Sequence, residues 1–404
     1  MAVQAQKFIA RNYDVFGGLD VDKKSMAVSF TDHQQLKQAL RLPYSAAQLL
    51  SYVRKHFAEQ RVAFVYEAGP TGFSLHDELV ANGYACLVVA PAMVPTAPGQ
   101  RVKTNRLDAR KLSENLRGGQ LRSIHVPSSS YSELRHLVQL RDPQVSEIRA
   151  SKCRIKALLL YEGMTFPGSG RWSAQVLREL AALPCSPAVH FKLEHLIGTL
   201  QFHFNSAATV QKEIRRHCQN DPELRQSITL LKSIPGIGWI VAAHLVARLG
   251  DWREIDNVRS IAGFLGLVSS EHSTGEKENR GSITRAGDSR LRNKLIQSAW
   301  VTIRKDPELR QFYRRIYQRH PKQVAARKAI VAVARKLTTR IYAVLKEQRP
   351  FVMRPDSSTA PLTAEETGGP RDRLDGQQSE QLWRTAVSLQ LEDSCLRQRT
   401  RGFR

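Results

Sequence analysis

The sequence predicts a mixed α/β domain at the N-terminus and mainly helical structure in the rest of the chain. Within the first 120 residues, short apolar runs alternate with segments whose apolar residues recur at helical spacing. From about residue 130 onwards the strand patterns fade, and apolar residues recur at intervals of three and four. The 404 residues are enough for about two or three domains of ordinary size.

The predicted elements of the N-terminal domain, residues 1–129, alternate between strand and helix. The apolar runs Val15–Val21 and Ser25–Phe30 flank the turn-like sequence DKK and predict a hairpin. The elements that follow are helix 45–60, strand 61–66, helix 74–82, strand 85–90 and helix 105–116. This order predicts a sheet with helices packed against it.

The remainder divides into a helical arm, a second helical unit and a tail. In the arm, residues 130–232, two long amphipathic segments are interrupted near 164–172, which indicates an antiparallel pair such as a coiled coil or dimer contact. The second unit, 233–350, is helical and basic. Residues 351–404 lack a core-forming pattern and predict a flexible tail with a short terminal helix.

Charge and composition restrict the class of partner. The net charge is +24, from 61 Lys and Arg against 37 Asp and Glu, so a nucleic acid is the expected partner because a polyanion offsets the self-repulsion. Apolar stretches are too short to span a membrane, and the N-terminus lacks the apolar core of a signal peptide. The five cysteines are scattered without a CxxC pair, which favours the reducing cytoplasm over a zinc site or disulfide framework.

Three carboxylates lie on successive elements of the predicted α/β domain. Asp20 is on the first strand, Glu67 ends a later strand before the turn sequence AGPTG, and Asp108 is on the helix that follows, three residues after Asn105. Asp and Glu supply the hard oxygen ligands that magnesium prefers, and two such ions can activate phosphodiester transfer. For Glu67 the structural alternative is a solvated carboxylate at the end of a strand.

The helical unit contains two further motifs. The sequence SIPGIGWIVAAHLVARLG, 233–250, predicts a tight turn between helices, in which Gly236 and Gly238 could approach a DNA phosphate as in a helix-hairpin-helix motif, or could serve only the turn. Residues 263–300 are rich in Ser, Gly and basic side chains and could be a polar surface loop. The candidate phosphate contacts are Lys277, Arg280, Arg285, Arg290 and Arg292.

Taken together, these motifs resemble a known family. The order of the motifs is the one found in Asp-Glu-Asp-Asp transposases of minimal bacterial insertion elements, the IS-one-ten and IS-eleven-eleven group. The motifs are, in order, Asp20, Glu67 in EAGPTG, KTNRLDARKL, PGIG and GLVSSEHSTGEKENRGSITRAGDSRLR. The resemblance covers roughly residues 13–350. It implies a RuvC-like, ribonuclease-H-like domain joined by a coiled-coil arm to a C-terminal transposase domain. It also implies magnesium, a homo-oligomer such as a dimer or tetramer, and an element-encoded bridge RNA that selects DNA.

The resemblance also implies roles for individual residues. Asp20, Glu67 and Asp108 correspond to three of the four acidic positions, whereas the fourth position holds Asn105, whose amide oxygen brings no charge. A serine nucleophile is expected just before the glycine of HSTG. Ser273 is the predicted nucleophile that forms a transient phosphoserine link to DNA, and Thr274 is the alternative.

Two other functions fit the same sequence. The first is a junction-resolving nuclease that uses metal-activated water and forms no covalent link. The second is a non-catalytic nucleic-acid-binding protein derived from a transposase that has lost activity, although Asn105 is interpreted as a tolerated variant whose amide oxygen can still bind a metal. A protein–DNA adduct distinguishes the transposase from the nuclease, and metal-dependent activity of any kind excludes the non-catalytic protein.

Overall fold

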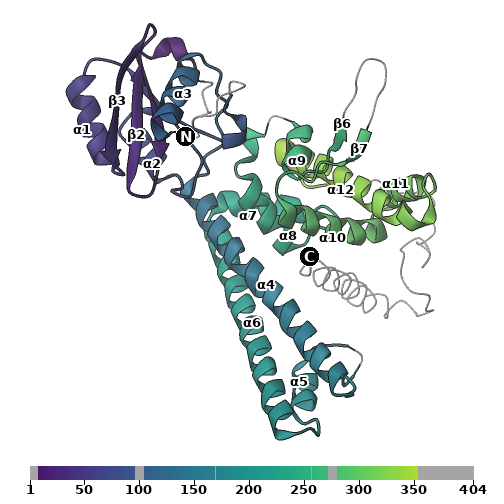
Figure 1. The fold of residues 1–404 in the computed structure, drawn as a ribbon. Helices are drawn as coiled ribbons and strands as arrows, with labels where there is room; N and C mark the ends of the chain where they lie inside the picture. Colours follow the sequence, from purple (N-terminus) through teal and green to yellow (C-terminus); the bar gives the residue numbers. More distant parts are fainter. Residues whose placement is uncertain (1–7, 96–103, 169, 256, 272–279, 354–404) are drawn as a thin grey trace. The chain divides into compact units, whose positions relative to one another are not determined.

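A computed structural model describes residues 8–95, 104–168, 170–255, 257–271 and 280–353. The chain divides into two compact units, residues 1–127 and 128–404 (Figure 1). The predictions for the 351–404 tail lie almost wholly outside the described residues. Among the helices that are described, none combines the length and the apolar character needed to cross a membrane.

The N-terminal unit contains one mixed sheet with strand order β3-β2-β1-β4-β5. β1 pairs antiparallel with β2 and parallel with β4; β2–β3 is antiparallel and β4–β5 parallel. The strands are β1 Val15–Val21, β2 Ser25–Thr31, β3 Leu36–Pro43, β4 Val62–Glu67 and β5 Ala85–Val89. The predicted hairpin of the first two strands is therefore confirmed.

Helices cover both faces of this sheet. They are α1 Ala46–His56, α2 Ser74–Ala81 and α3 Asn105–Arg117, with short 3₁₀ turns at Ala10–Asn12 and Pro91–Met93. Alternate strand residues face opposite sides. Leu19, Phe64 and Tyr66 pack with α1 and α2, whereas Phe16 and Val65 pack with α3. A core on each face explains why the central strands are almost continuously apolar.

The third strand was missed by the sequence analysis. In β3 every residue is at least partly exposed, and its sequence LKQALRLP has apolar residues spaced as in a helix. β3 lies at the edge of the sheet and pairs only with β2 there. An edge strand with little burial carries no alternating pattern, so pairing with β2, and not its own periodicity, determines its conformation.

The second unit is mainly helical. Its helices are α4 Ser129–Tyr161, α5 Ala174–Ala181, α6 Pro187–Asn220, α7 Pro222–Lys232, α8 Trp239–Leu249, α9 Val258–Phe264, α10 Ser289–Lys305, α11 Pro307–Tyr317 and α12 Lys322–Glu347. A 3₁₀ turn spans Trp252–Glu254, and a two-stranded antiparallel ribbon joins β6 Ser269–Glu271 to β7 Arg280–Ile283. Nothing in the sequence analysis predicted this ribbon.

Helices α4 and α6 lie side by side and run antiparallel, with α5 at their far end (Figure 1). His217 contacts the carbonyl oxygen of Ser130, and His203 contacts the side chain of Gln144, so the two helices advance in opposite directions in a constant register. The far end has a core of its own with α5. The near end instead shares the large core of α7 to α12, which makes it part of that helical unit.

Candidate functional site

The strand register brings two of the predicted carboxylates together. Leu19 of β1 is paired with Tyr66 of β4, so the next residues, Asp20 and Glu67, lie level on adjacent parallel strands about 4.8 Å apart. Both belong to the alternate positions that face α3, as Phe16 and Val65 do. Asp20 and Glu67 are each half-buried. The carboxyl ends of β1 and β4 therefore present two acids on one face.

Helix α3 brings the third carboxylate to this face. Asp108 is half-buried in the first turn and lies on the same helix side as Leu112, which packs on the sheet. Asn105, the first residue of α3, is exposed. Thr104 caps the helix, because its hydroxyl accepts a hydrogen bond from the Leu107 amide at 3.3 Å. These four predicted residues thus come from β1, β4 and the start of α3.

A glycine that the sequence analysis passed over permits this arrangement. A Cβ atom at Gly18 would lie 2.1 Å from the Ala109 carbonyl oxygen and 2.4 Å from the Ser113 amide nitrogen, far inside contact distance. Gly18 therefore lets the α3 backbone rest directly on β1, with Asp108 and Asp20 next to the contact. The signal in the sequence was a glycine pair within a strand pattern, which often marks a close backbone approach.

The loop after Glu67 is held in place by the side chain of Tyr66, the residue that precedes Glu67. The hydroxyl of buried Tyr66 donates to the Gly72 carbonyl oxygen at 3.1 Å. Burial raises the pKa of Tyr66, so this donor stays protonated at neutral pH. Gly72 has a φ of +70°, a conformation that other residues rarely adopt. The EAGPTG motif is thus a strand end followed by a tethered turn.

The arrangement has the residue types of a divalent metal site, but its three carboxylates do not converge on one point. Asp and Glu oxygens suit magnesium, and no histidine or cysteine is among the three acids. Across the part of the chain that the structure describes, no three His, Cys, Asp or Glu side chains are grouped closely enough to hold a metal. The three carboxylates share one face, and binding an ion there requires their side chains to converge.

The PGIG turn connects α7 to α8. Gly236 has a φ of +90°, and an added Cβ would lie 2.2 Å from the Thr302 hydroxyl of α10. Thr302 also donates this hydroxyl to the Pro235 carbonyl oxygen at 2.8 Å. Gly236 is thus explained by packing against α10, whereas Gly238 is exposed with open space at its Cβ position. Of the two glycines, Gly238 has the accessible backbone.

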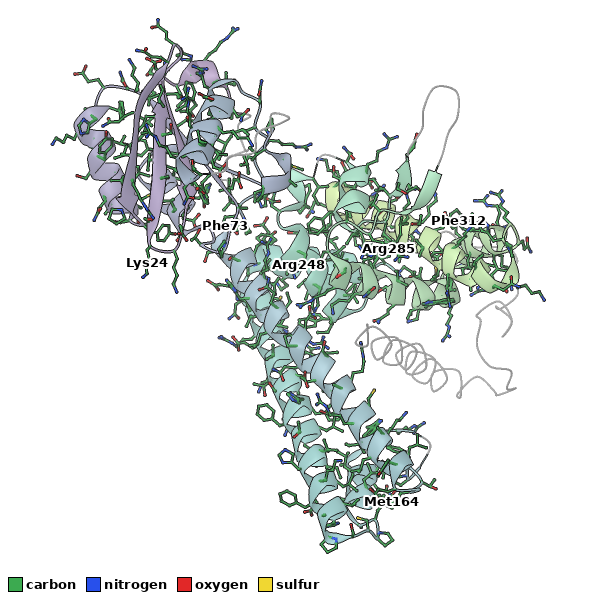
Figure 2. All side chains as sticks on the ribbon, in the orientation of Figure 1. Lys24, Phe73, Met164, Arg248, Arg285 and Phe312 are labelled. Atoms are coloured by element: carbon green, nitrogen blue, oxygen red, sulfur yellow. The ribbon has the colours of Figure 1, made fainter. Side chains whose placement is uncertain are left out.

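The basic residues beside the ribbon differ in their surroundings. Arg292 donates to the Leu265 carbonyl oxygen at 2.8 Å, so it helps to hold the segment before the ribbon. Arg285, labelled in Figure 2, is exposed and has a φ of +55°. Arg290 is exposed, although one of its guanidinium nitrogens lies 3.8 Å from the Asp142 carboxylate. Arg285 and Arg290 are accordingly available to a partner.

The predicted nucleophile cannot be placed. Ser273, Thr274 and Lys277 lie in 272–279, between β6 and β7 and outside the described residues; Arg280 begins β7, and its side chain is not described. The structure therefore leaves the pairing of a serine with the acidic residues as a prediction.

Comparison with known proteins identifies relatives of both units. A family model described as transposase matches residues 17–162, and one described as transposase IS116/IS110/IS902 family matches residues 228–314. The Sinorhizobium fredii protein y4qE, named as a transposase, is 32% identical over 317 residues, which is 76% of each chain. The transposase for insertion sequence element IS1533 of Leptospira borgpetersenii is 22% identical over 71% of this chain and 84% of its own.

A third relative has a different name. The pilin gene-inverting protein of Moraxella bovis is 33% identical over 132 residues, which is 32% of this chain and 40% of that protein. The first of the two family models spans the positions of Asp20, Glu67, Asn105 and Asp108. The second spans the PGIG turn, the ribbon and the basic residues beside it.

Proposed function

The chain belongs to the transposase IS116/IS110/IS902 family, and on that premise we propose that it cuts and rejoins DNA with magnesium held by Asp20, Glu67 and Asp108. The observation that carries the proposal is the register of β1 and β4, which sets Asp20 level with Glu67 on the face covered by α3. The strand order, with three antiparallel strands followed by two parallel ones, supports a RuvC-like interpretation of residues 1–129.

The metal would be held by hard oxygen ligands alone. Asp20 and Glu67 supply carboxylates from adjacent strands, Asp108 supplies a third from α3, and Asn105 can add a neutral amide oxygen. Bound there, magnesium would neutralise charge at the phosphate and ease ionisation of an attacking hydroxyl. The chain's own part is to bring these side chains together and to keep α3 against β1 through Gly18.

The nucleophile in this proposal is Ser273. Its Oγ forms a bond to phosphorus, the bond from phosphorus to the neighbouring sugar oxygen breaks, and that oxygen leaves with a proton. The product is a phosphoserine link, which a DNA hydroxyl later attacks to restore the serine and rejoin the strand. Placing Ser273 and the acids in different units would make cleavage depend on assembly, in keeping with a dimer or tetramer.

The remaining parts of the chain are proposed to serve assembly, contact with the nucleic-acid backbone and target choice. The arm at 130–232 is proposed as a coiled coil, which the antiparallel α4–α6 pair supports, and a role in assembly is proposed for it as well. The PGIG turn is proposed as a helix-hairpin-helix contact through Gly238, with Arg285 and Arg290 on the phosphate backbone. Target choice is assigned to a bridge RNA, in keeping with the net charge of +24.

The test is a search for a covalent protein–DNA species. Full-length protein with its co-purified RNA is mixed with element-junction DNA and magnesium, and the products are separated on a denaturing gel. We expect a DNA-linked band that Ser273→Ala abolishes and Thr274→Ala retains. Loss with Thr274→Ala alone moves the nucleophile by one residue. Cleaved DNA without any adduct supports the nuclease, and no metal-dependent product with any DNA supports the non-catalytic protein.

A further inference from the structure

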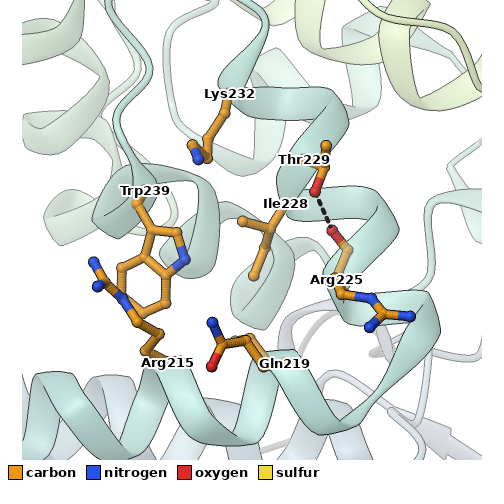
Figure 3. Close-up of a pocket in the computed structure, with 8 residues that line it drawn as sticks. Arg215, Gln219, Arg225, Ile228, Thr229, Lys232 and Trp239 are labelled. Atoms are coloured by element: carbon orange, nitrogen blue, oxygen red, sulfur yellow. Dashed lines mark hydrogen bonds between the residues drawn. The ribbon is translucent and has the colours of Figure 1, made fainter.

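A pocket in the helical unit is built from the end of α6, from α7 and from the first residue of α8 (Figure 3). Its volume is about 380 Å³, within the range of roughly 300–1,000 Å³ typical of ligand sites. Its floor includes buried Cys218 and Ile228, and Trp239 forms a wall. We call it the α6–α8 pocket; the eight residues that line it are Arg215, Cys218, Gln219, Arg225, Ile228, Thr229, Lys232 and Trp239.

The charges around the α6–α8 pocket are all positive. Arg215, Arg225 and Lys232 are exposed, and no Asp or Glu is among the lining residues. None of these three cations forms an ion pair with a carboxylate in the described parts of the chain. By contrast, Arg216, next to Arg215, is paired with Glu213 at 2.6 Å. Three uncompensated cations around a concave surface favour an anionic ligand.

Two features prepare the pocket for that ligand. The Arg215 guanidinium lies 5.1 Å from the centre of the Trp239 ring, and stacking of this kind holds the group in place while its N–H donors stay free. Trp239 is also the first residue of α8, whose N-cap, Gly238, has no side chain to satisfy the first amides. The partial positive charge of this helix end therefore begins at the pocket wall.

The pocket is suited to binding and not to catalysis. Burial raises the pKa of Cys218 to about 12, so its thiol is not ionised at neutral pH. The lining residues include no histidine, aspartate or glutamate that could act as a general base. Thr229 donates its hydroxyl to the Arg225 carbonyl oxygen at 2.8 Å, which leaves the oxygen as an acceptor.

We infer that the α6–α8 pocket binds the phosphodiester backbone of a nucleic acid. Arg215 and Lys232 flank Trp239 in Figure 3 and would hold one phosphate there, whereas the Arg225 head group points to the other side and would meet the neighbouring phosphate. The inference rests on the proposed function and deepens it, because it adds Arg215, Arg225 and Lys232 to the backbone contacts proposed for Gly238 and for the basic residues beside the ribbon. DNA and RNA share this backbone chemistry, so the experiment separates them.

The test measures binding of full-length protein to two labelled probes, a DNA duplex of arbitrary sequence and an RNA hairpin, at several salt concentrations. The double variant Arg215→Gln/Lys232→Gln should bind at least one probe roughly tenfold more weakly, with a salt dependence shallower by up to about two released counterions. A loss confined to one probe identifies the source of the phosphate. Thermal unfolding of each variant verifies that the fold is intact.

The matched control is Lys192→Gln/Lys212→Gln, which removes the same charge from exposed positions of α6 outside the pocket. A larger loss in the pocket variant than in this control supports the inference. Equal losses, or none, overturn it while the proposed function stands. If the wild-type protein binds neither probe even at about 50 mM salt, the proposed function fails, and the pocket inference fails with it.

Discussion

Two carboxylates of the helical unit and two of the N-terminal unit have different surroundings. In the helical unit, Asp306 is 1% exposed, pairs with the guanidinium of Arg340 and caps α11, and Asp142 lies 3.0 Å from the ammonium of Lys294. At the end of β4 and the start of α3, neither Glu67 nor Asp108 forms an ion pair with any residue that the structure describes. A buried charge without a partner is costly, so structural carboxylates are neutralised within the fold.

The difference separates two uses of an acid. Asp142 joins α4 to α10, which are distant in the sequence, and Asp306 joins the consecutive helices α11 and α12; the charge of both is satisfied by the protein itself. Glu67 and Asp108 are half-buried on the α3 face, and in the proposed function their charge would be balanced by a magnesium ion. Substitution of Asp306 or Asp142 should therefore lower stability, whereas substitution of Glu67 or Asp108 should lower activity.

The largest effect is expected from Glu67→Gln. The amide keeps the size of the side chain but removes the charge, so magnesium should bind less well, and DNA cleavage should fall by about 1,000-fold, equivalent to about 4 kcal/mol. The free energy of unfolding should change by less than about 0.5 kcal/mol. Strand cleavage on a denaturing gel and urea unfolding measure the two quantities. Exposed Glu59→Gln is the control, and cleavage retained by Glu67→Gln would contradict the assignment.

Asp306→Ala should reverse this pattern. It leaves Arg340 without its buried partner and removes the cap whose carboxylate accepts from the Leu309 amide at 2.9 Å, so unfolding free energy should fall by about 3–5 kcal/mol. Urea unfolding measures the loss. Glu308 contacts the same arginine at 3.1 Å but is exposed, so Glu308→Ala should cost less than about 1 kcal/mol. Equal losses would show that burial does not determine how much each carboxylate contributes to the free energy of unfolding.

The surroundings of Asp142 predict a pH dependence. His244 is buried, with Nε2 3.7 Å from the Asp142 carboxylate; burial, followed by the charge of Lys294, lowers its pKa well below the usual value. The unfolded chain therefore binds a proton near pH 6.5 that the folded chain does not, so stability should fall as the pH drops below that value. This group should contribute a loss of about 2 kcal/mol between about pH 7 and pH 5.

Urea unfolding of the wild type and of His244→Gln at the two pH values isolates this contribution. The glutamine has no titration, so the variant should lose about 2 kcal/mol less than the wild type on acidification. Carboxylates elsewhere titrate equally in both proteins and cancel in the comparison. Identical pH dependence in the two proteins would mean that His244 takes up its proton over the same pH range in the folded and unfolded chains.

The smallest effect is expected from Thr104→Ala. Loss of the cap on α3 should cost about 1 kcal/mol and let the first turn, which carries Asn105 and Asp108, fray. Cleavage should then fall a few-fold and recover at higher magnesium. Ser45→Ala removes the equivalent cap of α1 and should lower stability similarly without changing cleavage. The same cleavage defect in both variants would show that the start of α3 has no special role in the site.

Much of the N-terminal unit could be predicted because its elements carry local signals. The β1–β2 hairpin, the buried strands β4 and β5, and α3 all follow from periodicity and turn residues. The carboxylates were found because strand ends and helix starts are visible in the sequence. The edge strand β3 and the β6–β7 ribbon were missed because each gains its conformation from a partner strand and not from a buried pattern of its own.

The sequence by itself determined the alternating elements of the first unit, the helical character of the second and the family to which the motifs point. Only the tertiary structure decided that Asp20 and Glu67 lie level on one face, that Gly18 admits α3, and that Arg215, Lys232 and Trp239 surround one pocket. Periodicity is a property of neighbouring residues. Strand register, close backbone approach and shared pockets depend on packing between segments that are distant in the chain, which no local pattern records.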